Sequence, residues 1–169
     1  MHSNKNLSET FITFLTTGGT FDKVYFDAKS EFYIGDPMID SILEEANISF
    51  QYEVISILKK DSLDINDSDR EQIRKAVLES SNNLIIITHG TDAMVETANC
   101  LSGINNKTIV LVGAMQPARM RLSDASYNIG VATTAVQLLP TGVHLAMNGQ
   151  IFDPAKTRKN WQKGRFESA

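Results

Sequence analysis

Two largely apolar runs in this chain each end in a short segment rich in threonine and glycine. Residues 11–15 (FITFL) lead into the TTGGT segment at 16–20, and residues 84–87 (LIII) lead into THGTD at 88–92. Such runs are typical of parallel strands that are covered on both faces. Open α/β sheets bind their ligands at glycine turns that follow these strands. The pair of turns therefore predicts a parallel α/β fold with a site that presents free hydroxyl groups.

Apolar runs and amphipathic helical patterns alternate along the rest of the chain. The runs are residues 10–16, 52–58, 84–88, 108–112 and 143–147. The predicted helices begin at Asp36-Pro37, at a capping box of Ser68 and Glu71, at Asp92 and at Asp124. This alternation is typical of βαβ units. It predicts the α/β class, as a three-layer α/β/α sandwich around a mostly parallel sheet of about five strands.

Length and composition favour one soluble domain. The 169 residues predict a single domain over 10–169 after a polar tail at 1–9. The net charge of −4 gives no reason to expect nucleic acid or a membrane surface as partner, and no apolar run is long enough to span a bilayer. A single cysteine, Cys100, and no apparent signal peptide lead us to expect a cytoplasmic protein.

In a parallel α/β sheet every turn from strand to helix opens at the same edge. That edge is expected to collect residues 17–23, 61–64, 89–92, 113–117 and 148–156. The sequence therefore predicts that these scattered segments form one pocket.

Thr20 and Thr91 are the candidate reactive hydroxyls of that pocket. A threonine hydroxyl needs a neighbour that takes or polarises its proton. Gly18 and Gly19 allow a sharp turn before Thr20 and leave amide N–H groups free, although a plain turn between strand and loop is an equal alternative. For Thr91 and Asp92 the local pattern favours a helix cap and a first-turn carboxylate. Their functional interpretation needs a base near Thr91 and a cationic group of the ligand for Asp92.

Lys156 is the candidate base, because a partly desolvated lysine beside its partner can accept a proton. The alternative is that Lys156 is one more solvated lysine of a basic tail. The neighbouring Arg158, Lys159, Lys163 and Arg165 are expected to be solvated.

Three further positions carry polar groups that could serve the same pocket. Tyr25 or Tyr33, in a polar stretch after Thr20, could close over a ligand, or anchor a long loop. Ser62 and Asp64 could bind a ligand's charged groups or cap the next helix. His89 has no second histidine or cysteine at ligand spacing, so we expect a hydrogen-bonding role and no metal site. Phosphate-loop, dinucleotide-binding and serine-hydrolase motifs do not occur.

Five segments, in collinear order, resemble the bacterial-type L-asparaginase family, also called the asparaginase/glutaminase family. The signature pair is TGGT at 17–20 and THGTD at 88–92. The later segments are VGAM with Pro117, Ser123-Asp124 with Asn128, and Asp153 with Lys156-Thr157. The resemblance covers roughly residues 10–160.

The resemblance implies a flavodoxin-like sheet and hydrolysis of asparagine to aspartate and ammonia through a threonine ester, without a cofactor. Thr20 and Thr91 match the family's two catalytic threonines, and Lys156 matches the lysine that pairs with the second. Asp92 matches the acid that binds the substrate's amino group. The further positions expected to contact substrate are Gly19, Ser62, Asp64, Gly90 and Ala114, with Tyr25 or Tyr33 as the lid tyrosine.

Two departures from the family pattern shape the expectation. Leu63 stands where the family usually has a glutamine, and the smaller C-terminal domain of two-domain members has no counterpart in these 169 residues. We therefore expect a single-domain asparaginase acting on asparagine or glutamine, as a homodimer or larger homo-oligomer. The alternative is a non-catalytic asparagine or aspartate sensor, or an amidase subunit that works with another chain.

Overall fold

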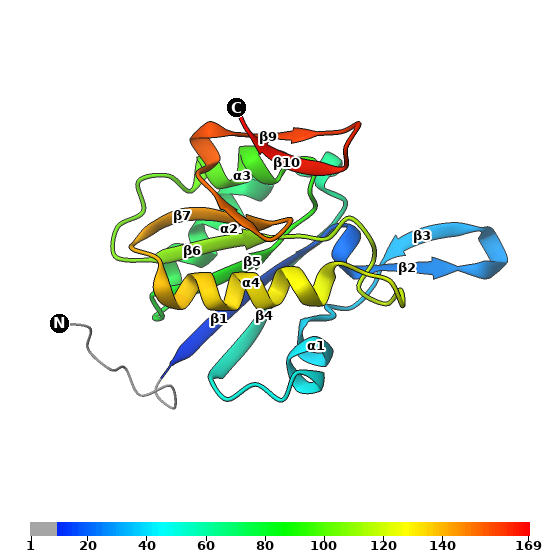
Figure 1. The fold of residues 1–169 in the computed structure, drawn as a ribbon, viewed down its shortest axis with the longest axis horizontal. Coiled ribbons are helices and arrows are strands. Elements are labelled where there is room, and N and C mark those ends of the chain that lie inside the picture. The colour runs from blue at the N-terminus through cyan, green and yellow to red at the C-terminus, as the bar shows by residue number, and fades with distance from the viewer. Residues whose placement is uncertain (1–9) are drawn as a thin grey trace.

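Six strands form a central sheet in the order β4-β1-β5-β6-β7-β8 (Figure 1). The computed structural model describes residues 10–169, so the predicted tail at residues 1–9 lies outside the described residues. The strands are β1 (Phe11–Gly18), β4 (Gln51–Lys60), β5 (Leu84–Thr88), β6 (Thr108–Val112), β7 (Gly142–Met147) and β8 (Gln150–Phe152). The five predicted runs form the parallel strands, and β8 adds an antiparallel strand at one edge.

The strand order reverses direction next to β1. β1 pairs with β4 on one side and with β5 on the other, and the later strands continue outward from β5. Among the parallel strands this is the flavodoxin-like order 2-1-3-4-5. In such sheets the connections after the two central strands leave toward opposite faces and open a crevice between them. The crevice here lies between the turns that follow β1 and β5.

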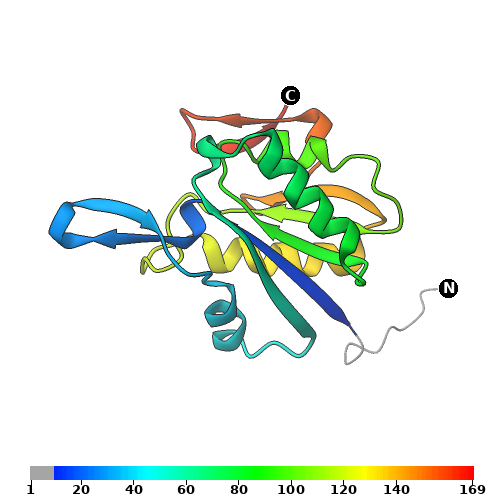
Figure 2. The same cartoon turned by 180° about the vertical axis from the view of Figure 1, so that it is seen from behind.

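Two helices cover each face of the sheet, which confirms the three-layer arrangement. α1 (Ile39–Glu45) and α4 (Ala125–Leu138) lie on the face toward the viewer in Figure 1. α2 (Asp67–Glu79) and α3 (Met94–Cys100) lie on the face seen in Figure 2. Among residues 10–169, no helix is both long and apolar enough to cross a membrane.

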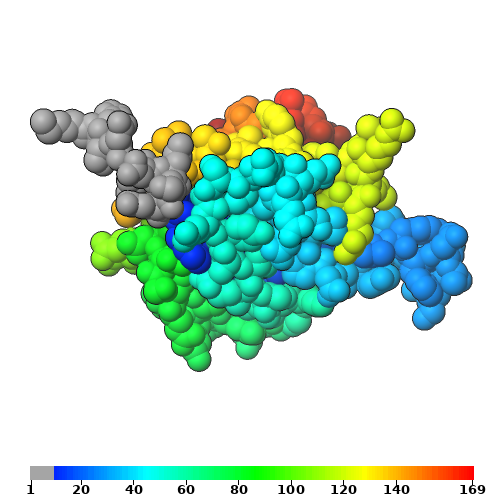
Figure 3. All heavy atoms as spheres, turned by 90° about the horizontal axis from the view of Figure 1, so that it is seen from below, coloured from blue at the N-terminus to red at the C-terminus, as the bar shows by residue number. Residues whose placement is uncertain are grey.

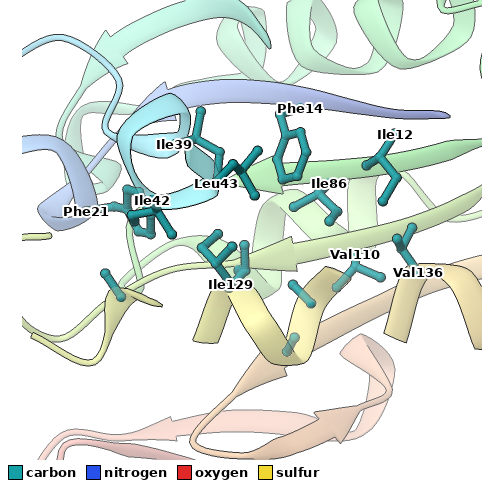
Figure 4. Packing of buried hydrophobic residues seen from close by; sticks show 14 of the residues in the cluster. Ile12, Phe14, Phe21, Ile39, Ile42, Leu43, Ile86, Val110, Ile129 and Val136 are labelled. Carbon is teal, nitrogen blue, oxygen red and sulfur yellow. The ribbon is translucent and has the colours of Figure 1, made fainter. Parts of the chain in front are cut away.

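Each face of the sheet has its own hydrophobic core. Phe14 and Ile86 point from β1 and β5 toward Ile129 and Val136 on α4, and all four side chains are at most 2% exposed (Figure 4). On the other face, Leu15 and neighbouring strand residues pack against α2 and α3. Burial of this kind stabilises each large side chain by roughly 1.5–3 kcal/mol. The two cores hold the strand ends in fixed positions.

Two antiparallel hairpins lie outside the central sheet. One consists of β2 (Lys23–Phe26) and β3 (Glu31–Ile34) and protrudes from the body (Figures 1 and 3). The other consists of β9 (Thr157–Asn160) and β10 (Arg165–Ser168) and lies beside α3 in Figure 1. Short 3₁₀ turns connect several elements, and they are η2 (Thr20–Asp22), η3 (Asp27–Lys29), η4 (Ser62–Asp64) and η5 (Pro154–Lys156).

The capping box of α2 lies two residues before the predicted one. The Asn66 side chain accepts the Asp69 N–H at 3.1 Å, and the Asp69 carboxylate accepts the Asn66 N–H at 3.0 Å. Ser68 is already inside the first turn, so the predicted Ser68–Glu71 box is wrong. Both patterns fit a capping box locally, and the extended backbone of Asn66 decides between them.

The predicted cap of α1 is also wrong. The helix begins after Met38, its N-cap residue, and no side-chain hydrogen bond caps it; the Met38 N–H donates to Asp22 Oδ1 at 2.9 Å. Asp36 instead forms an exposed ion pair with Lys59. Burial raises the pKa of the Asp22 carboxyl to about 6.

Asn66→Ala removes the acceptor that satisfies the Asp69 N–H, and should lower the free energy of unfolding by about 1 kcal/mol. Ser68→Ala is the matched control and should change it by less than about 0.5 kcal/mol. Urea unfolding followed by circular dichroism measures both. Equal losses in the two variants would contradict the observed cap.

Candidate active site

The turns after β1 and β5 touch through their glycines. Gly18 and Gly19 have φ angles of 96° and 73°, which makes the sharp turn that the sequence predicts. A Cβ atom added at Gly19 would lie 2.5 Å from both Cα and N of Gly90, so only glycine fits there. Thr20 and Thr91 each directly follow one of these glycines. The strand order thus brings the two threonine segments together at the crevice.

Two further strand ends complete the same cluster. A Cβ added at Gly90 would lie 2.5 Å from Ser62 Oγ, and a Cβ added at Gly113 would lie 3.1 Å from Thr91 Cγ2. Ser62 is 2% exposed and Ala114, directly after Gly113, is 1% exposed. The ends of β1, β4, β5 and β6 therefore meet at one place, which confirms the predicted convergence for four of the five segments.

Lys159 joins this cluster from the β9–β10 hairpin. Its Nζ donates to Thr91 Oγ1 at 2.8 Å and forms an ion pair with the Asp92 carboxylate. Thr91 is 5% exposed, and the side chains of Lys159 and Asp92 are 12% and 22% exposed. The arrangement places a lysine amine beside Thr91, and the same lysine pairs with Asp92, so the cation beside Asp92 is a group of the protein and not the ligand cation that the sequence argument asks for.

The expectation that Lys156 would contact Thr91 is wrong, and so is the expectation that Lys159 is solvated. The segment after β7 does not stay at the site edge, because β8 is antiparallel to β7 and carries the chain back along it. Lys156 is therefore exposed in η5, which packs against α3. β9 then returns to the site edge with Lys159. The sequence did contain a second candidate for this role, because Lys159 lies three residues after Lys156 in the same basic segment.

The structure does not support the helix-cap alternatives for the site residues. α3 begins at Met94 with Ala93 as its N-cap, and no side chain caps it, so Thr91 and Asp92 both precede the helix. The N-cap of α2 is Asn66, so neither Ser62 nor Asp64 caps that helix. Asp64 is exposed at the end of η4, outside the buried cluster.

One expected hydrogen-bond donor is already engaged. The Gly19 N–H donates to the Lys60 carbonyl at 2.8 Å, so the expectation that this amide stays free is wrong. A further bond, from Thr17 Oγ1 to the Thr88 carbonyl at 2.9 Å, joins the ends of β1 and β5. These contacts fix the turn that precedes Thr20.

His89 is a fully buried, neutral part of the second turn. Burial lowers the pKa of its imidazole to about 4, because an imidazolium would lose its hydration there. Its Nδ1 lies 2.8 Å from the Gly90 carbonyl, so the neutral ring donates its proton to that oxygen. Nε2 is buried with no hydrogen-bond partner among the described residues. The predicted hydrogen-bonding role of His89 fits this geometry.

The two candidate lid tyrosines lie on opposite faces of the β2–β3 hairpin. The pairing of Tyr25 with Phe32 and of Lys23 with Ile34 puts all four side chains on one face. On that face Lys23 forms an ion pair with Asp61 at 2.6 Å, next to Ser62. Tyr33 belongs to the other face and lines a separate surface pocket that includes Lys59 and Arg119. Tyr25 thus lies on the same hairpin face as Lys23, whose ion pair with Asp61 connects that face to the site.

The chain is an open parallel α/β domain in which two threonine-containing turns meet at the point where the strand order reverses. The family model for the N-terminal domain of asparaginases matches residues 11–167. The chain therefore belongs to the asparaginase family.

In residues 10–169 no group of three or more histidine, cysteine, aspartate or glutamate side chains is placed to hold a metal ion.

Relatives and solved structures agree with this membership. The chain is 34% identical to a probable periplasmic L-asparaginase of Haemophilus influenzae, over 83% of the chain and 43% of that protein. It is 32% identical to one of the subunits of the glutamyl-tRNA(Gln) amidotransferase of Methanococcus vannielii, over 90% of the chain and 37% of that protein. The thermostable L-asparaginase from Thermococcus kodakarensis superposes with a TM-score of 0.80 and 28% identity, covering 94% of the chain and 51% of that structure. The chain thus spans about half the length of these proteins or less.

His89→Gln should make stability less sensitive to acid. The unfolded chain protonates this imidazole near pH 6.5 and the native state only near pH 4, so native stability falls as the pH drops through that window. Between pH 7 and pH 5 this loss is about 2 kcal/mol in the native sequence and absent in the variant. Protonation of Asp22 favours the native state as the pH falls through part of this range, and it does so in both proteins. The difference in pH dependence between the native protein and the variant therefore reports on His89.

Denaturant unfolding at the two pH values measures the effect. His144→Gln is the control, because His144 is only half-buried and lies away from the turns, beside the Pro140 carbonyl. If His89→Gln and the native protein show the same pH dependence, the native state does not lower the pKa of this imidazole.

Proposed function

We propose that this protein hydrolyses the side-chain amide of a small amino acid, with asparagine as the substrate, to give the carboxylate and ammonia. The observation that carries the proposal is the Lys159 ammonium, which contacts both Thr91 and Asp92 at the junction of the two glycine turns. The L-asparaginase relatives support the same chemistry.

In the proposed reaction the Thr20 hydroxyl attacks the amide carbon. The C–N bond breaks, the nitrogen leaves as ammonia with the hydroxyl proton, and an ester to Thr20 remains. Water then hydrolyses the ester and restores the hydroxyl. Lys159 donates to Thr91 Oγ1, so the proton of Thr91 points away from the ammonium. Thr91 can then pass this proton to the leaving nitrogen while it takes up the proton that Thr20 releases, and one proton in total reaches the ammonia. General acid–base assistance of this kind contributes about 10²–10⁴ in rate.

Substrate recognition is proposed for the groups around the threonines. Asp92 carries the carboxylate for a substrate amino group, and Ser62 is buried against Gly90 where it can bind a substrate carboxylate. Ala114, which is 1% exposed, and the exposed Asp64 are further proposed contacts of the substrate. Discrimination between asparagine and glutamine then depends on pocket depth, and one methylene group is worth only about 1–3 kcal/mol.

Ammonia release from asparagine and glutamine tests this function. Thr20→Ala and Thr91→Val should each lower kcat by at least about 10³-fold, because each removes a reacting hydroxyl. Lys159→Met should lower it by about 10²-fold or more. Lys156→Met is the matched control, a lysine of the same segment that is exposed in η5, and should retain nearly full activity.

The four variants separate the possible outcomes. Full activity in Thr20→Ala or Thr91→Val would refute the role given to that hydroxyl. If Lys156→Met loses activity and Lys159→Met keeps it, the lysine assignment is reversed while the amide hydrolysis stands. Circular dichroism of each variant checks that its fold is intact.

Tyr25→Phe should lower kcat more than Tyr33→Phe does, by about tenfold. Tyr25 shares the hairpin face of Lys23, which is tied to Asp61 beside Ser62, whereas Tyr33 faces away from it. A phenol that closes over the substrate can assist proton transfer. Steady-state kinetics of the two variants decides the question, and a larger defect in Tyr33→Phe would assign the lid role to the other face.

A second candidate function is that of an amidase subunit acting with another chain. The similarity to the Methanococcus vannielii amidotransferase favours it, because that relative matches 90% of this chain. The site proposed here would then release ammonia for use by a partner protein. Robust hydrolysis of free asparagine by the purified chain would favour the first candidate. Binding of asparagine without turnover would favour the amidase subunit or a sensor.

We further propose a homodimer or larger homo-oligomer in a reducing compartment. Closed symmetric dimers are the commonest assemblies of soluble chains, and a second copy could cover the open side of the crevice.

The only cysteine, Cys100, is exposed and unpaired, which fits a cytoplasmic environment. The Haemophilus influenzae relative is named as periplasmic, so the compartment needs its own test by fractionation.

A further inference from the structure

Trp161 lies in the turn between β9 and β10, and its indole ring covers the Lys159 ammonium. Lys159 Nζ is 4.2 Å from the ring centroid, while the same atom donates to Thr91 Oγ1 and pairs with Asp92. The indole is 64% exposed, whereas the Lys159 side chain is only 12% exposed. The ring therefore shields the ammonium on a side that Thr91 and Asp92 leave uncovered.

We propose that Trp161 is a positioning residue that holds the Lys159 ammonium against Thr91 and Asp92. The inference rests on the proposed function for its catalytic part. A lysine ammonium sits on a flexible four-carbon stem and is strongly hydrated, so it needs partners to keep one orientation. The negative face of an indole attracts a cation placed within about 6 Å of its centroid. Trp161 meets that condition for the one lysine that contacts Thr91.

The exposure of Trp161 argues against a role in holding the hairpin together. Other residues do that. Phe166 of β10 is 3% exposed and packs against Phe152, and its N–H donates to Asn148 Oδ1 at 2.9 Å. Glu167 accepts from Asn160 Nδ2 at 3.0 Å across the two strands. Replacement of Trp161 is therefore expected to leave the hairpin in place.

Trp161 is the only tryptophan in the chain, so its fluorescence reports on this contact directly. Lys159→Met removes the cation from the ring and should change the intensity and the wavelength of the emission maximum. Lys163→Met is the matched control, because Lys163 lies in the same turn but is paired with Glu167 and mostly exposed. Emission that Lys159→Met leaves unchanged, or that both variants change equally, would overturn the contact.

The kinetic arm compares Trp161→Ala with Trp161→Phe, using asparagine as substrate. Loss of the aromatic face should lower kcat by about tenfold with little change in KM, and the phenyl ring should restore most of that loss. A purely structural role would not be rescued in kcat alone. Equal kcat in the alanine and phenylalanine variants, or a change confined to KM, would overturn the positioning role.

The two arms separate this inference from the proposed function. If the native protein hydrolyses no amide, the proposed function and with it the catalytic part of the inference fail, while the emission of Lys159→Met still decides the contact. If the native protein is active and Trp161→Ala is as active, the positioning role alone fails. Thermal unfolding of both Trp161 variants confirms that they are folded.

Discussion

The contact between Gly19 and Gly90 is the constraint on which the site depends. No side chain fits between these two backbones, because a Cβ at Gly19 would lie 2.5 Å from Gly90. The contact sits where the strand order reverses, between β1 and β5, so two connections that leave toward opposite faces still begin side by side. Thr20 and Thr91 are the first side chains after it. The closeness of their two backbone segments thus follows from the topology of the sheet and from the absence of a side chain at Gly19.

Around this contact the strand ends and the hairpins make different contributions. The ends of the parallel strands supply Thr20, Ser62 and Thr91, and two buried cores hold those strands in register. The hairpins supply the long side chains, Lys159 from one and the tyrosines from the other. A rigid base thus carries the hydroxyl groups, while the groups that reach toward them extend from surface elements. This division suits a site in which a ligand must enter before the long side chains close around it.

The path of the chain after β7 explains why the lysine lies where it does. A turn at Asn148-Gly149, both with positive φ, reverses the chain into β8, and η5 lies well back from the site edge. β9 runs forward again and β10 anchors it, through the bond from the Phe166 N–H to Asn148. The cation at Thr91 is therefore delivered by two reversals that lie outside the parallel sheet.

The elements that depend on local pattern could be predicted from the residues alone. The five apolar runs became the parallel strands, the helical stripes became four helices, and the threonine–glycine turns marked the strand ends where the site formed. The choice of Lys159 over Lys156 needed the packed structure. The two lysines lie three residues apart in one basic segment, and local sequence does not encode that the chain turns back toward the site between them. The packed structure likewise placed Asp22 at the start of α1 and Tyr25 on the hairpin face next to Asp61. Short-range periodicity reflects which face of an element is buried, whereas the meeting of distant side chains depends on how the elements pack.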